Sequence, residues 1–445
     1  MTGSACDCLV AGAGPAGALL AGKLAREGRD VVLVHAEGEA HGLPEETLVP
    51  GARALFERLG ISALLERPAQ SAAQRHGTVW GEPRMVWREE YGLRPLQVER
   101  TSFDTALREW AVAGGARLVH GRVRELSGQS APIEVGAQAF DAQVTVAATG
   151  RTAAGVAQCD LREELEPTLA LSTAVDASGD AAVIEAVPEG WLWWLPGRNG
   201  VCLSLFADRE EVRARGKQEV WEAALGAATG PAREAGGSPT RGTDATARRR
   251  ESDVLLVGDA AASLDPLSSQ GLEKSLSSAE DTAACVHTLL DEPTWRSLVH
   301  EHRRTWERRL FRAHADRTAD FYREEQRFAD EPFWRLRREP AQRARVTGPL
   351  PAALTRSAQL EPVTLLERKA ERLVCVDGFR AGEEVLARLG ALELAAVLDL
   401  VGAGGPLPAI IERARTDARM RAFTPNDLVR ALAELYSLGF LVAAP

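Results

Sequence analysis

Short apolar runs alternate with a helix-forming stretch at the start of the chain. Residues 8–11 and 31–34 are apolar, and small and apolar residues of helical character fill 18–26 between them. Short apolar runs of this kind are typical of buried strands, and the stretch between them has the length of a crossover helix. The pattern predicts a β-α-β unit, the element from which parallel sheets are built.

Glycines fill the turn between the first strand and the helix, which reads Gly12-Ala13-Gly14-Pro15-Ala16-Gly17. In this spacing Gly12 permits a tight turn, Gly14 lets the backbone approach a pyrophosphate, and Gly17 lets the helix pack on the strand. The N-terminus of the helix adds free N–H groups and a favourable dipole. Strand, turn, helix and second strand follow in order, which favours a dinucleotide-binding site over a plain glycine-rich turn.

Position 35, at the end of the second strand, departs from this pattern. Asp or Glu usually stands there and accepts hydrogen bonds from a ribose, whereas this chain has His35, with Glu37 two residues on. A neutral imidazole nitrogen can accept one hydrogen bond; the alternative is that His35 only ends the strand. The sequence therefore defines the pyrophosphate contacts better than the adenosine contacts.

Two further apolar runs end in glycine turns. Residues 144–151 end in Thr-Gly-Arg, and residues 254–261 pass through Gly258-Asp259. Asp259 is then expected at the carboxyl end of a strand, where an open α/β sheet binds its ligand and a carboxylate can accept hydrogen bonds from a ribityl or ribose hydroxyl. Pro266 suits the start of a helix that runs toward residue 290.

Alternating apolar and polar residues predict a second, antiparallel sheet. A strand-length run covers residues 80–87, and residues 226–248, rich in Gly, Ala, Thr and Pro, are predicted to form a loop or crossover. The main strands are expected at residues 168–175, 181–187, 191–195 and 201–207.

The last third of the chain is predicted to be largely helical. Residues 301–345 carry 13 Arg against 9 acidic residues; we interpret most of these arginines as a solvated helix face, with docking of an acidic protein as the alternative. Residues 361–445 carry 12 acidic and 10 basic residues, and this negative balance argues against DNA binding. Amphipathic helices at 392–401, 407–415 and 424–440 suggest a small helical, winged-helix-like domain.

Composition narrows the class of protein. The 445 residues are 45% hydrophobic and 26% charged, which is typical of a globular protein of about three domains. A net charge of −10 disfavours a nucleic-acid-binding protein, and no apolar stretch is long enough to span a membrane. The six cysteines and eight histidines show no metal-ligand spacing, so no metal is expected, and scattered thiols predict a cytoplasmic protein.

Four further motifs carry a family resemblance. They are Glu46-Thr47-Leu48-Val49-Pro50, Arg100-Thr101-Ser102-Phe103-Asp104, Ala148-Thr149-Gly150-Arg151 and Trp191-Leu192-Trp193-Trp194-Leu195-Pro196. With the glycine motifs they resemble the FAD-dependent monooxygenase superfamily built like the aromatic hydroxylases. Within it, they are most similar to the branch of flavin-dependent halogenases and geranylgeranyl-reductase-like proteins. Residues 265–274 and the overall layout most resemble the flavoproteins of tryptophylquinone maturation.

The resemblance implies FAD as the cofactor and an α/β fold. This fold is a Rossmann-like FAD-binding domain with an inserted antiparallel-sheet substrate domain over the flavin and a C-terminal helical module. The expected domains are FAD binding at 1–55, 98–155 and 250–300, substrate binding at 56–97 and 156–249, a helical connector at 301–360 and the C-terminal module at 361–445. The residues assigned to FAD binding are Gly12, Gly14, Pro15, Ala16, Gly17, His35, Glu37, Thr47, Arg100, Val123, Thr149, Gly150, Asp259, Pro266, Gln270, Gly271 and Leu272.

The implied activity is hydroxylation of an electron-rich aromatic ring through a flavin C4a-hydroperoxide. The substrate it favours is a peptidyl tryptophan in a partner protein docked over the flavin pocket, during maturation of the cysteine tryptophylquinone of quinohemoprotein amine dehydrogenase. Reducing equivalents would come from NAD(P)H directly or through a reductase. Such chemistry asks the protein mainly for orientation and exclusion of water, so no catalytic residue is assigned. His76 and Tyr91 are candidate pocket residues, with plain packing as the alternative for both.

Halogenation, another activity of this branch, is disfavoured because it relays hypohalous acid through a pocket lysine. Between the first glycine motif and Arg100 the chain has only Lys23, expected on the helix after the glycine turn and away from substrate. Two alternatives stay open. One is a flavin oxidoreductase acting on a small molecule or lipid, such as a small-aromatic hydroxylase or a prenyl reductase; the other is a non-catalytic flavin-bearing scaffold.

Overall fold

A computed structural model describes residues 3–36, 45–48, 52–65, 75–88, 96–126, 132–156, 159, 161–197, 200–338 and 350–444. The contacts divide the chain into two units: unit 1 comprises residues 1–293 and 306–341, and unit 2 comprises residues 294–305 and 342–445. Within the described residues, none of the helices combines the length and the apolar character that a membrane span requires. The predicted domain boundaries stay a prediction.

Unit 1 contains a sheet of five parallel strands. In spatial order these are β7 (Arg117–His120), β2 (Val31–His35), β1 (Ser4–Ala11), β9 (Gln138–Ala147) and β17 (Leu255–Leu256). A short strand, β8 (Ile133–Val135), pairs antiparallel with β9. Counted along the chain the order is 3-2-1-4-5, which is the strand order of Rossmann-type dinucleotide-binding folds. The Rossmann-like prediction is confirmed.

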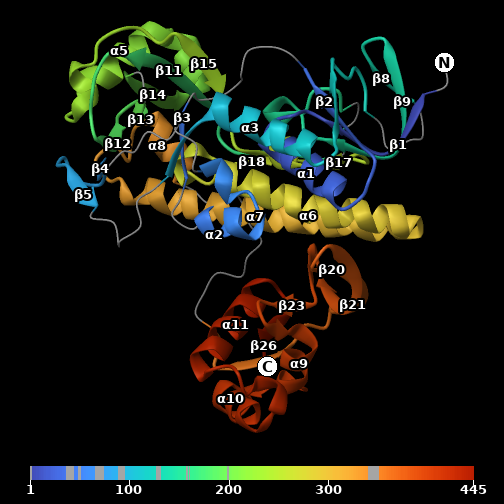
Figure 1. Ribbon diagram of the computed structural model, residues 1–445. Coiled ribbons are helices and arrows are strands. Elements are labelled where there is room, and N and C mark those ends of the chain that lie inside the picture. The colour runs from blue at the N-terminus through green and yellow to red at the C-terminus, as the bar shows by residue number, and fades with distance from the viewer. Residues whose placement is uncertain are drawn as a thin grey trace. The chain divides into compact units, whose positions relative to one another are not determined.

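Helix α1 (Pro15–Arg26) packs between α3 (Arg100–Ala113) and α6 (Gly271–Asp291), as Figure 1 shows. This helix layer covers one face of the sheet, and Val32 and Val34 pack in an apolar cluster with Leu126. Strand β2 is therefore buried along almost its whole length, which explains its continuous apolar run. At Gly22 an added Cβ would lie 2.4 Å from the ring of Trp110, so α1 and α3 lie in close contact there. The predicted β-α-β unit is therefore confirmed.

A seven-stranded sheet forms the second layer of unit 1, in the order β15-β11-β14-β13-β12-β4-β5. Its four central strands are antiparallel neighbours and match the predicted ones: β11 (Thr168–Val175), β12 (Ala181–Val187), β13 (Gly190–Gly197) and β14 (Gly200–Asp208). Helices α4 (Arg209–Arg215) and α5 (Lys217–Ala227) follow β14. Val220 and Trp221 of α5 join the apolar cluster on one face of this sheet.

Two predictions about this sheet are wrong. Residues 80–85 connect β4 (Arg75–Val79) to β5 (Val86–Arg88) and are not a strand, because Gly81 and Pro83 favour a bend there. The predicted loop at 226–248 contains β15 (Arg241–Asp244), which pairs with β11 at the edge of the sheet. An edge strand of polar residues has no apolar alternation, so the sequence pattern did not reveal it.

Smaller elements complete unit 1. Strand β3 (Glu45–Leu48) pairs with β6 (Leu96–Glu99), and β16 (Arg248–Glu251) lies between β10 (Leu161–Glu164) and β18 (Ala262–Ser263). Helix α2 (Ala52–Arg58) precedes strands β4 and β5 of the seven-stranded sheet.

Two helices, α7 (Arg296–Glu324) and α8 (Pro332–Arg337), confirm the predicted helical stretch within the described residues. The interpretation of their arginines as a solvated face is partly wrong. Arg303 and Arg337 are only 5% and 6% exposed, and Arg337 donates to the carbonyl of Pro167 at 2.8 Å. Helical spacing alone does not show which side of a helix another layer covers.

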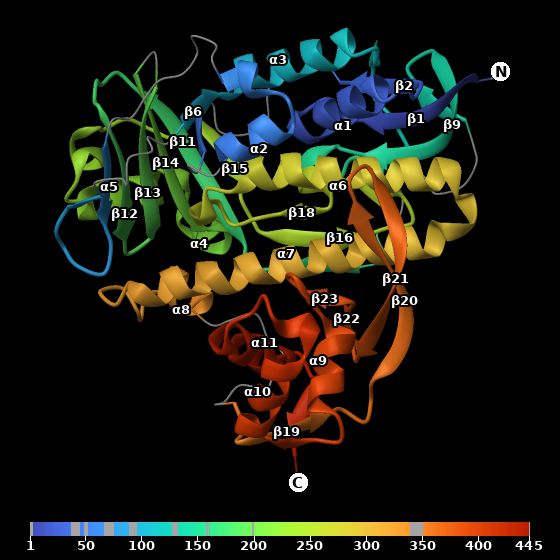
Figure 2. The same ribbon diagram turned by 60° about the horizontal axis from the view of Figure 1, so that its bottom comes forward.

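Unit 2 contains the three predicted helices, α9 (Leu394–Val401), α10 (Leu407–Thr416) and α11 (Pro425–Ser437). They enclose an apolar cluster that runs from Leu354 to Leu441. A three-stranded sheet, β25 (Gly405–Pro406), β19 (Ala353–Arg356) and β26 (Leu441–Ala443), accompanies them. A long hairpin of β20 (Glu361–Lys369) and β21 (Arg372–Ala381), visible in Figure 2, was not predicted from the sequence.

Candidate functional site

The carboxyl ends of the five parallel strands lie along one edge of the sheet, and each is followed by a residue assigned to the cofactor. Val123 comes after β7, His35 ends β2, Gly12 follows β1, Thr149 follows β9 and Asp259 follows β17. The chain order reverses between β1 and β9, and ligands of open α/β sheets bind outside the strand ends at such a reversal. The structure therefore brings these residues to the edge where a dinucleotide is expected.

The glycine turn is shaped by close backbone contacts. An added Cβ at Gly12, whose φ is +109°, would lie 2.3 Å from the carbonyl oxygen of Ala148, and one at Gly17 would lie 1.9 Å from the carbonyl oxygen of Gly12. Gly14 differs, because no atom of the described residues lies within 4 Å of its added Cβ. Gly14 is also the N-cap of α1, and no side chain caps the helix there. The open space and the free N–H groups at this residue fit a bound pyrophosphate.

The Gly258-Asp259 turn lies directly against the glycine turn. Gly258 has φ +62°, and an added Cβ would lie 2.6 Å from the Cβ of Ala16. The carboxylate of Asp259 lies 3.5 Å from the guanidinium of Arg151 and 3.5 Å from the Nζ of Lys274. Its side chain keeps 28% exposure, so an acceptor oxygen stays accessible to a ligand hydroxyl.

Two predicted cofactor residues hold buried hydroxyls that lack a hydrogen-bond partner among the described residues. These are the Oγ1 atoms of Thr47 and Thr149. Buried polar atoms are nearly always paired in proteins, so both hydroxyls fit contacts to a bound group. Gly150, next to Thr149, has φ +67° and begins a short 3-10 turn.

Glu46, on β3, connects helix α3 to the start of α6. Its carboxylate accepts from Arg100 at 2.7 Å and from the backbone N–H of Leu272 at 3.1 Å, and an added Cβ at Gly271 would lie 3.5 Å from it. Burial alone would lower the pKa of Arg100, but the carboxylates of Glu46 and Asp104 raise it above its ordinary value. Arg100 is thus a permanently charged residue whose donors are shared with Glu46 and Asp104.

The segment before α6 begins with a capped turn. Asp265 accepts a hydrogen bond from the N–H of Leu267 at 2.9 Å, and Pro266 occupies the first position of the turn. The hydroxyl of Tyr322, on α7, donates to the other oxygen of Asp265 at 3.0 Å. Burial raises the pKa of Asp265, although both hydrogen bonds oppose this shift. Gln270 then stands at the N-cap of α6.

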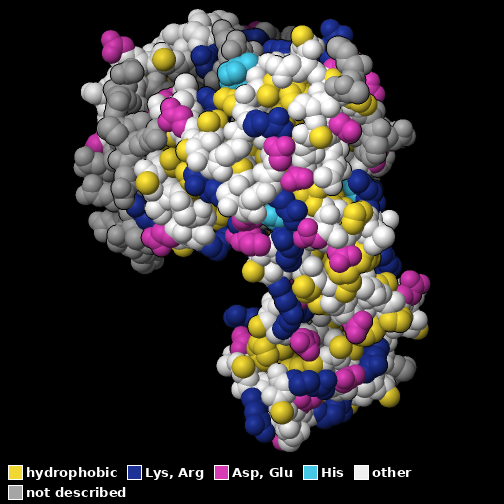
Figure 3. Space-filling model, turned by 45° about the vertical axis from the view of Figure 1, so that its right-hand side comes forward, with side chains coloured by type: hydrophobic (Ala, Val, Ile, Leu, Met, Phe, Trp, Pro, Cys, Tyr) yellow, Lys and Arg dark blue, Asp and Glu magenta, His cyan; other side chains and the backbone are white. Residues whose placement is uncertain are grey.

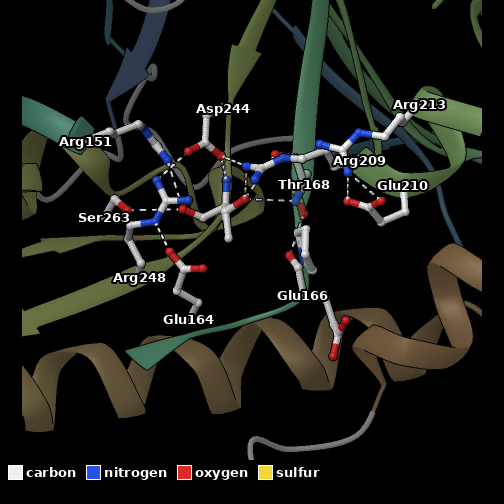
Figure 4. A network of polar contacts seen from close by, with 12 residues as sticks. Arg151, Glu164, Glu166, Thr168, Arg209, Glu210, Arg213, Asp244, Arg248 and Ser263 are labelled. Carbon is white, nitrogen blue, oxygen red and sulfur yellow. Dashed lines mark hydrogen bonds and ion pairs between the residues drawn. The ribbon is translucent and has the colours of Figure 1, made fainter. Parts of the chain in front are cut away.

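A polar network joins the turn after β9, which contains Arg151, to the second sheet, as Figure 4 shows. Arg151 donates to the backbone carbonyl of Thr246 at 3.4 Å, and Arg248 pairs with Glu164 at 2.7 Å and with Asp244. Asp244 also pairs with Arg209. The pKa of Asp244 falls to about 2, because hydrogen bonds from Arg248 and Thr246 outweigh the effect of its burial. This junction fixes Arg151, one of the two cations beside Asp259.

The tryptophan motif lies on β13, and its three tryptophans are buried. Trp191 and Trp193 face an aromatic cluster with Tyr322 and Trp334, which also contacts Leu267 of the segment before α6. Trp194 points to the opposite face of the sheet. All three tryptophans therefore pack inside the protein, and the cluster of Trp191 and Trp193 places an apolar wall next to the segment that precedes α6.

The remaining predicted residues are less informative. His76 lies on β4 of the second sheet, away from the parallel strand ends, and is half-buried. Tyr91 and Glu37 lie outside the described residues. Sequence reasoning missed the roles of Glu46, Lys274, Ser278 and Tyr322. Lys274 and Ser278 lie four residues apart, but α6 carries several other polar residues, so this spacing alone did not single them out.

This fold and site define a dinucleotide-binding protein of the Rossmann type. The FAD binding domain family matches residues 5–300, more than half of the chain, and the chain belongs to this family. FAD is therefore its cofactor. The residues at the strand ends, with Thr47, would hold it.

Several solved structures share the fold. A peptidyl tryptophan dihydroxylase essential for tryptophylquinone cofactor biogenesis, QhpG, is 23% identical, with a TM-score of 0.71 over 98% of this chain and 100% of that chain. The flavin-dependent halogenase CmlS is 18% identical, with a TM-score of 0.72 over 100% of this chain and 96% of that one. A menaquinone reductase of Mycolicibacterium smegmatis is 32% identical over 120 residues, which is 26% of this chain and only 29% of that protein.

Proposed function

We propose that the protein is an FAD-dependent monooxygenase that hydroxylates an electron-rich aromatic ring, namely a peptidyl tryptophan in a partner protein. Bound FAD, once reduced by NAD(P)H or a reductase, supplies the activation of molecular oxygen. Similarity to the tryptophan dihydroxylase over almost the whole length of both chains supports the proposal. The halogenase similarity is equally extensive, so overall shape does not separate the two reactions.

The placement of the lysines is the observation that favours hydroxylation. Lys23 lies on α1 and pairs with Glu27 at 2.9 Å, and Lys274 is buried against backbone carbonyls. Lys217 is exposed at the start of α5, and Lys369 belongs to unit 2. Lys23 and Lys274 thus hold contacts within the protein, and Lys217 and Lys369 lie outside the segments that carry the predicted FAD residues.

The protein's own contribution is orientation and exclusion of water. Trp191, Trp193 and Trp334 supply large apolar surfaces beside the segment that precedes α6. A protein substrate also needs docking area, and we assign that role to unit 2. Acidic and basic side chains are interleaved on the face that Figure 3 shows, so charge does not favour an acidic partner.

The menaquinone reductase similarity favours one alternative function, reduction of a small molecule or lipid. Such a reductase would transfer hydrogen to its substrate and would not incorporate oxygen. Incorporation of an oxygen atom from labelled molecular oxygen into the product therefore separates the two activities.

The test is co-expression with a tryptophan-containing protein encoded by a neighbouring gene, followed by intact and peptide mass spectrometry. We expect one or two added oxygen atoms on a single tryptophan. A Gly14→Ala variant, which should lack FAD, is the matched control. An unmodified partner together with hydrogen gain on an added quinone would overturn the proposal in favour of the reductase.

A further inference from the structure

Helix α6 points two buried polar side chains at the Gly258-Asp259 turn. Lys274 is 3% exposed and Ser278 is 0% exposed. Burying a lysine is costly unless its donors are paired, and this chain has only four lysines. The sequence position, four residues apart, places both side chains on one face of the helix.

These two side chains hold both peptide groups that flank the Cα of Gly258. The Nζ of Lys274 donates to the carbonyl oxygen of Gly258 at 2.7 Å and also to that of Ala262. The Oγ of Ser278 accepts from the N–H of Gly258 at 3.1 Å and donates to the carboxylate of Glu307, on α7, at 2.9 Å. The turn is therefore fixed from α6 on both sides.

This clamp, formed by Lys274 and Ser278, acts on a crowded position that fits a glycine and no larger residue. Gly258 combines a left-handed φ with a close approach to Ala16, so the turn fits against the glycine turn in one orientation only. Asp259 follows immediately, and the third donor of Lys274 lies 3.5 Å from its carboxylate. A shift of the clamp would move Asp259 relative to the glycine turn.

Two cations and two carboxylates lie around this clamp, so their charges balance. Lys274 and Arg151 face the carboxylates of Asp259 and Glu307. Burial lowers the pKa of Lys274, and the two carboxylates oppose this shift. His314, whose pKa is lowered by burial and by Lys274, adds no charge near neutral pH.

We propose that Lys274 and Ser278 are positioning residues for the flavin site: they orient Asp259 through Gly258 and so set the affinity for FAD. The inference rests on FAD binding by the family and not on the substrate proposed above, so it stands or falls separately from the hydroxylation. Neither side chain has to touch the cofactor for this role.

The test measures the dissociation constant for FAD by quenching of flavin fluorescence and the melting temperature of the apoprotein. We expect Ser278→Ala to weaken FAD binding about tenfold, which corresponds to about 1.4 kcal/mol, and Lys274→Met to weaken it further. Thr282→Val is the matched control, because its buried hydroxyl donates to the carbonyl of Ser278 within α6, with no contact to the Gly258-Asp259 turn among the described residues. It should leave FAD affinity within about twofold.

A double-mutant cycle distinguishes positioning from general destabilisation. If Ser278 acts through Asp259, then Ser278→Ala should cost little additional FAD affinity in an Asp259→Ala background. Visible circular dichroism of the bound flavin should change in Ser278→Ala and not in Thr282→Val. Additive losses in the cycle, or wild-type FAD affinity in Ser278→Ala, would overturn the proposal even if Lys274→Met fails to fold.

Discussion

At the scale of single residues, substitutions of Gly14 and Gly17 are expected to distinguish an effect on FAD binding from an effect on folding. Gly14→Ala places a Cβ in open space where the pyrophosphate is expected, so we predict a large loss of FAD affinity with an unchanged apoprotein melting temperature. Gly17→Ala places a Cβ 1.9 Å from a backbone oxygen, so it should lower the melting temperature as well. Titration with FAD and calorimetry of the apoprotein check both results; an unstable Gly14→Ala apoprotein would contradict the first.

His314 gives a residue-scale prediction for pH. Burial, with Lys274 and Arg317 nearby, lowers its pKa to about 4, against an unfolded value of about 6.5. Between these values only the unfolded chain binds the proton, so stability should fall as pH decreases through this window. From pH 7 to pH 5 we expect the free energy of unfolding to fall by about 1–2 kcal/mol more in the wild type than in His314→Gln. Parallel urea titrations of the two proteins measure the difference, and identical pH profiles would contradict it.

At the scale of elements, one hydrogen bond connects α7 to the turn before α6. Tyr322→Phe removes the donor to Asp265 and leaves a buried carboxylate with one partner fewer. We predict a loss of about 1.5–3 kcal/mol in the free energy of unfolding, as for other hydrogen bonds to charged groups. Urea denaturation measures this loss. In an Asp265→Asn background the same change should cost clearly less, and equal costs would show that the bond contributes nothing specific.

Elements with a strong apolar pattern were predictable from sequence, and polar ones were not. The central strands at 190–208 are buried on both faces, against the cluster of Trp221 on one face and the cluster of Trp334 on the other. The first β-α-β unit likewise has continuous buried runs. Strand β15 and the hairpin of β20 and β21 have many exposed positions. These strands form because they pair with other strands, and the local sequence pattern does not indicate such pairing.

At the scale of the whole molecule, we expect FAD binding to be independent of the C-terminal part of unit 2. All predicted FAD residues precede residue 273, and the core of unit 2 lies between Leu354 and Leu441. We predict that a fragment of residues 1–349 stays yellow after gel filtration. A fragment of residues 350–445, which lacks residues 294–305 of unit 2 but keeps its whole apolar cluster, should still melt cooperatively by circular dichroism. A colourless 1–349 fragment, beside a yellow full-length protein, would contradict this independence; Gly14→Ala in the full chain is the colourless reference.

The site was predictable only where its residues belong to one local motif. Gly12, Gly14 and Gly17 form a contiguous turn whose steric requirements are local, so their spacing alone indicated their purpose. Lys274 and Ser278 act on Gly258 across the space between α6 and a strand end. Glu46 likewise reaches Arg100 and Leu272 from a distant strand.

The sequence by itself determined the parallel-sheet core, the glycine turn and the strands of the second sheet, because hydrophobic periodicity and backbone sterics are local properties of the chain. Tertiary structure alone decided which strand ends meet at the reversal between β1 and β9. It also decided which arginines are buried and which side chains fix Asp259. Those outcomes depend on contacts between residues far apart in the chain, and such contacts leave no periodic pattern in the sequence.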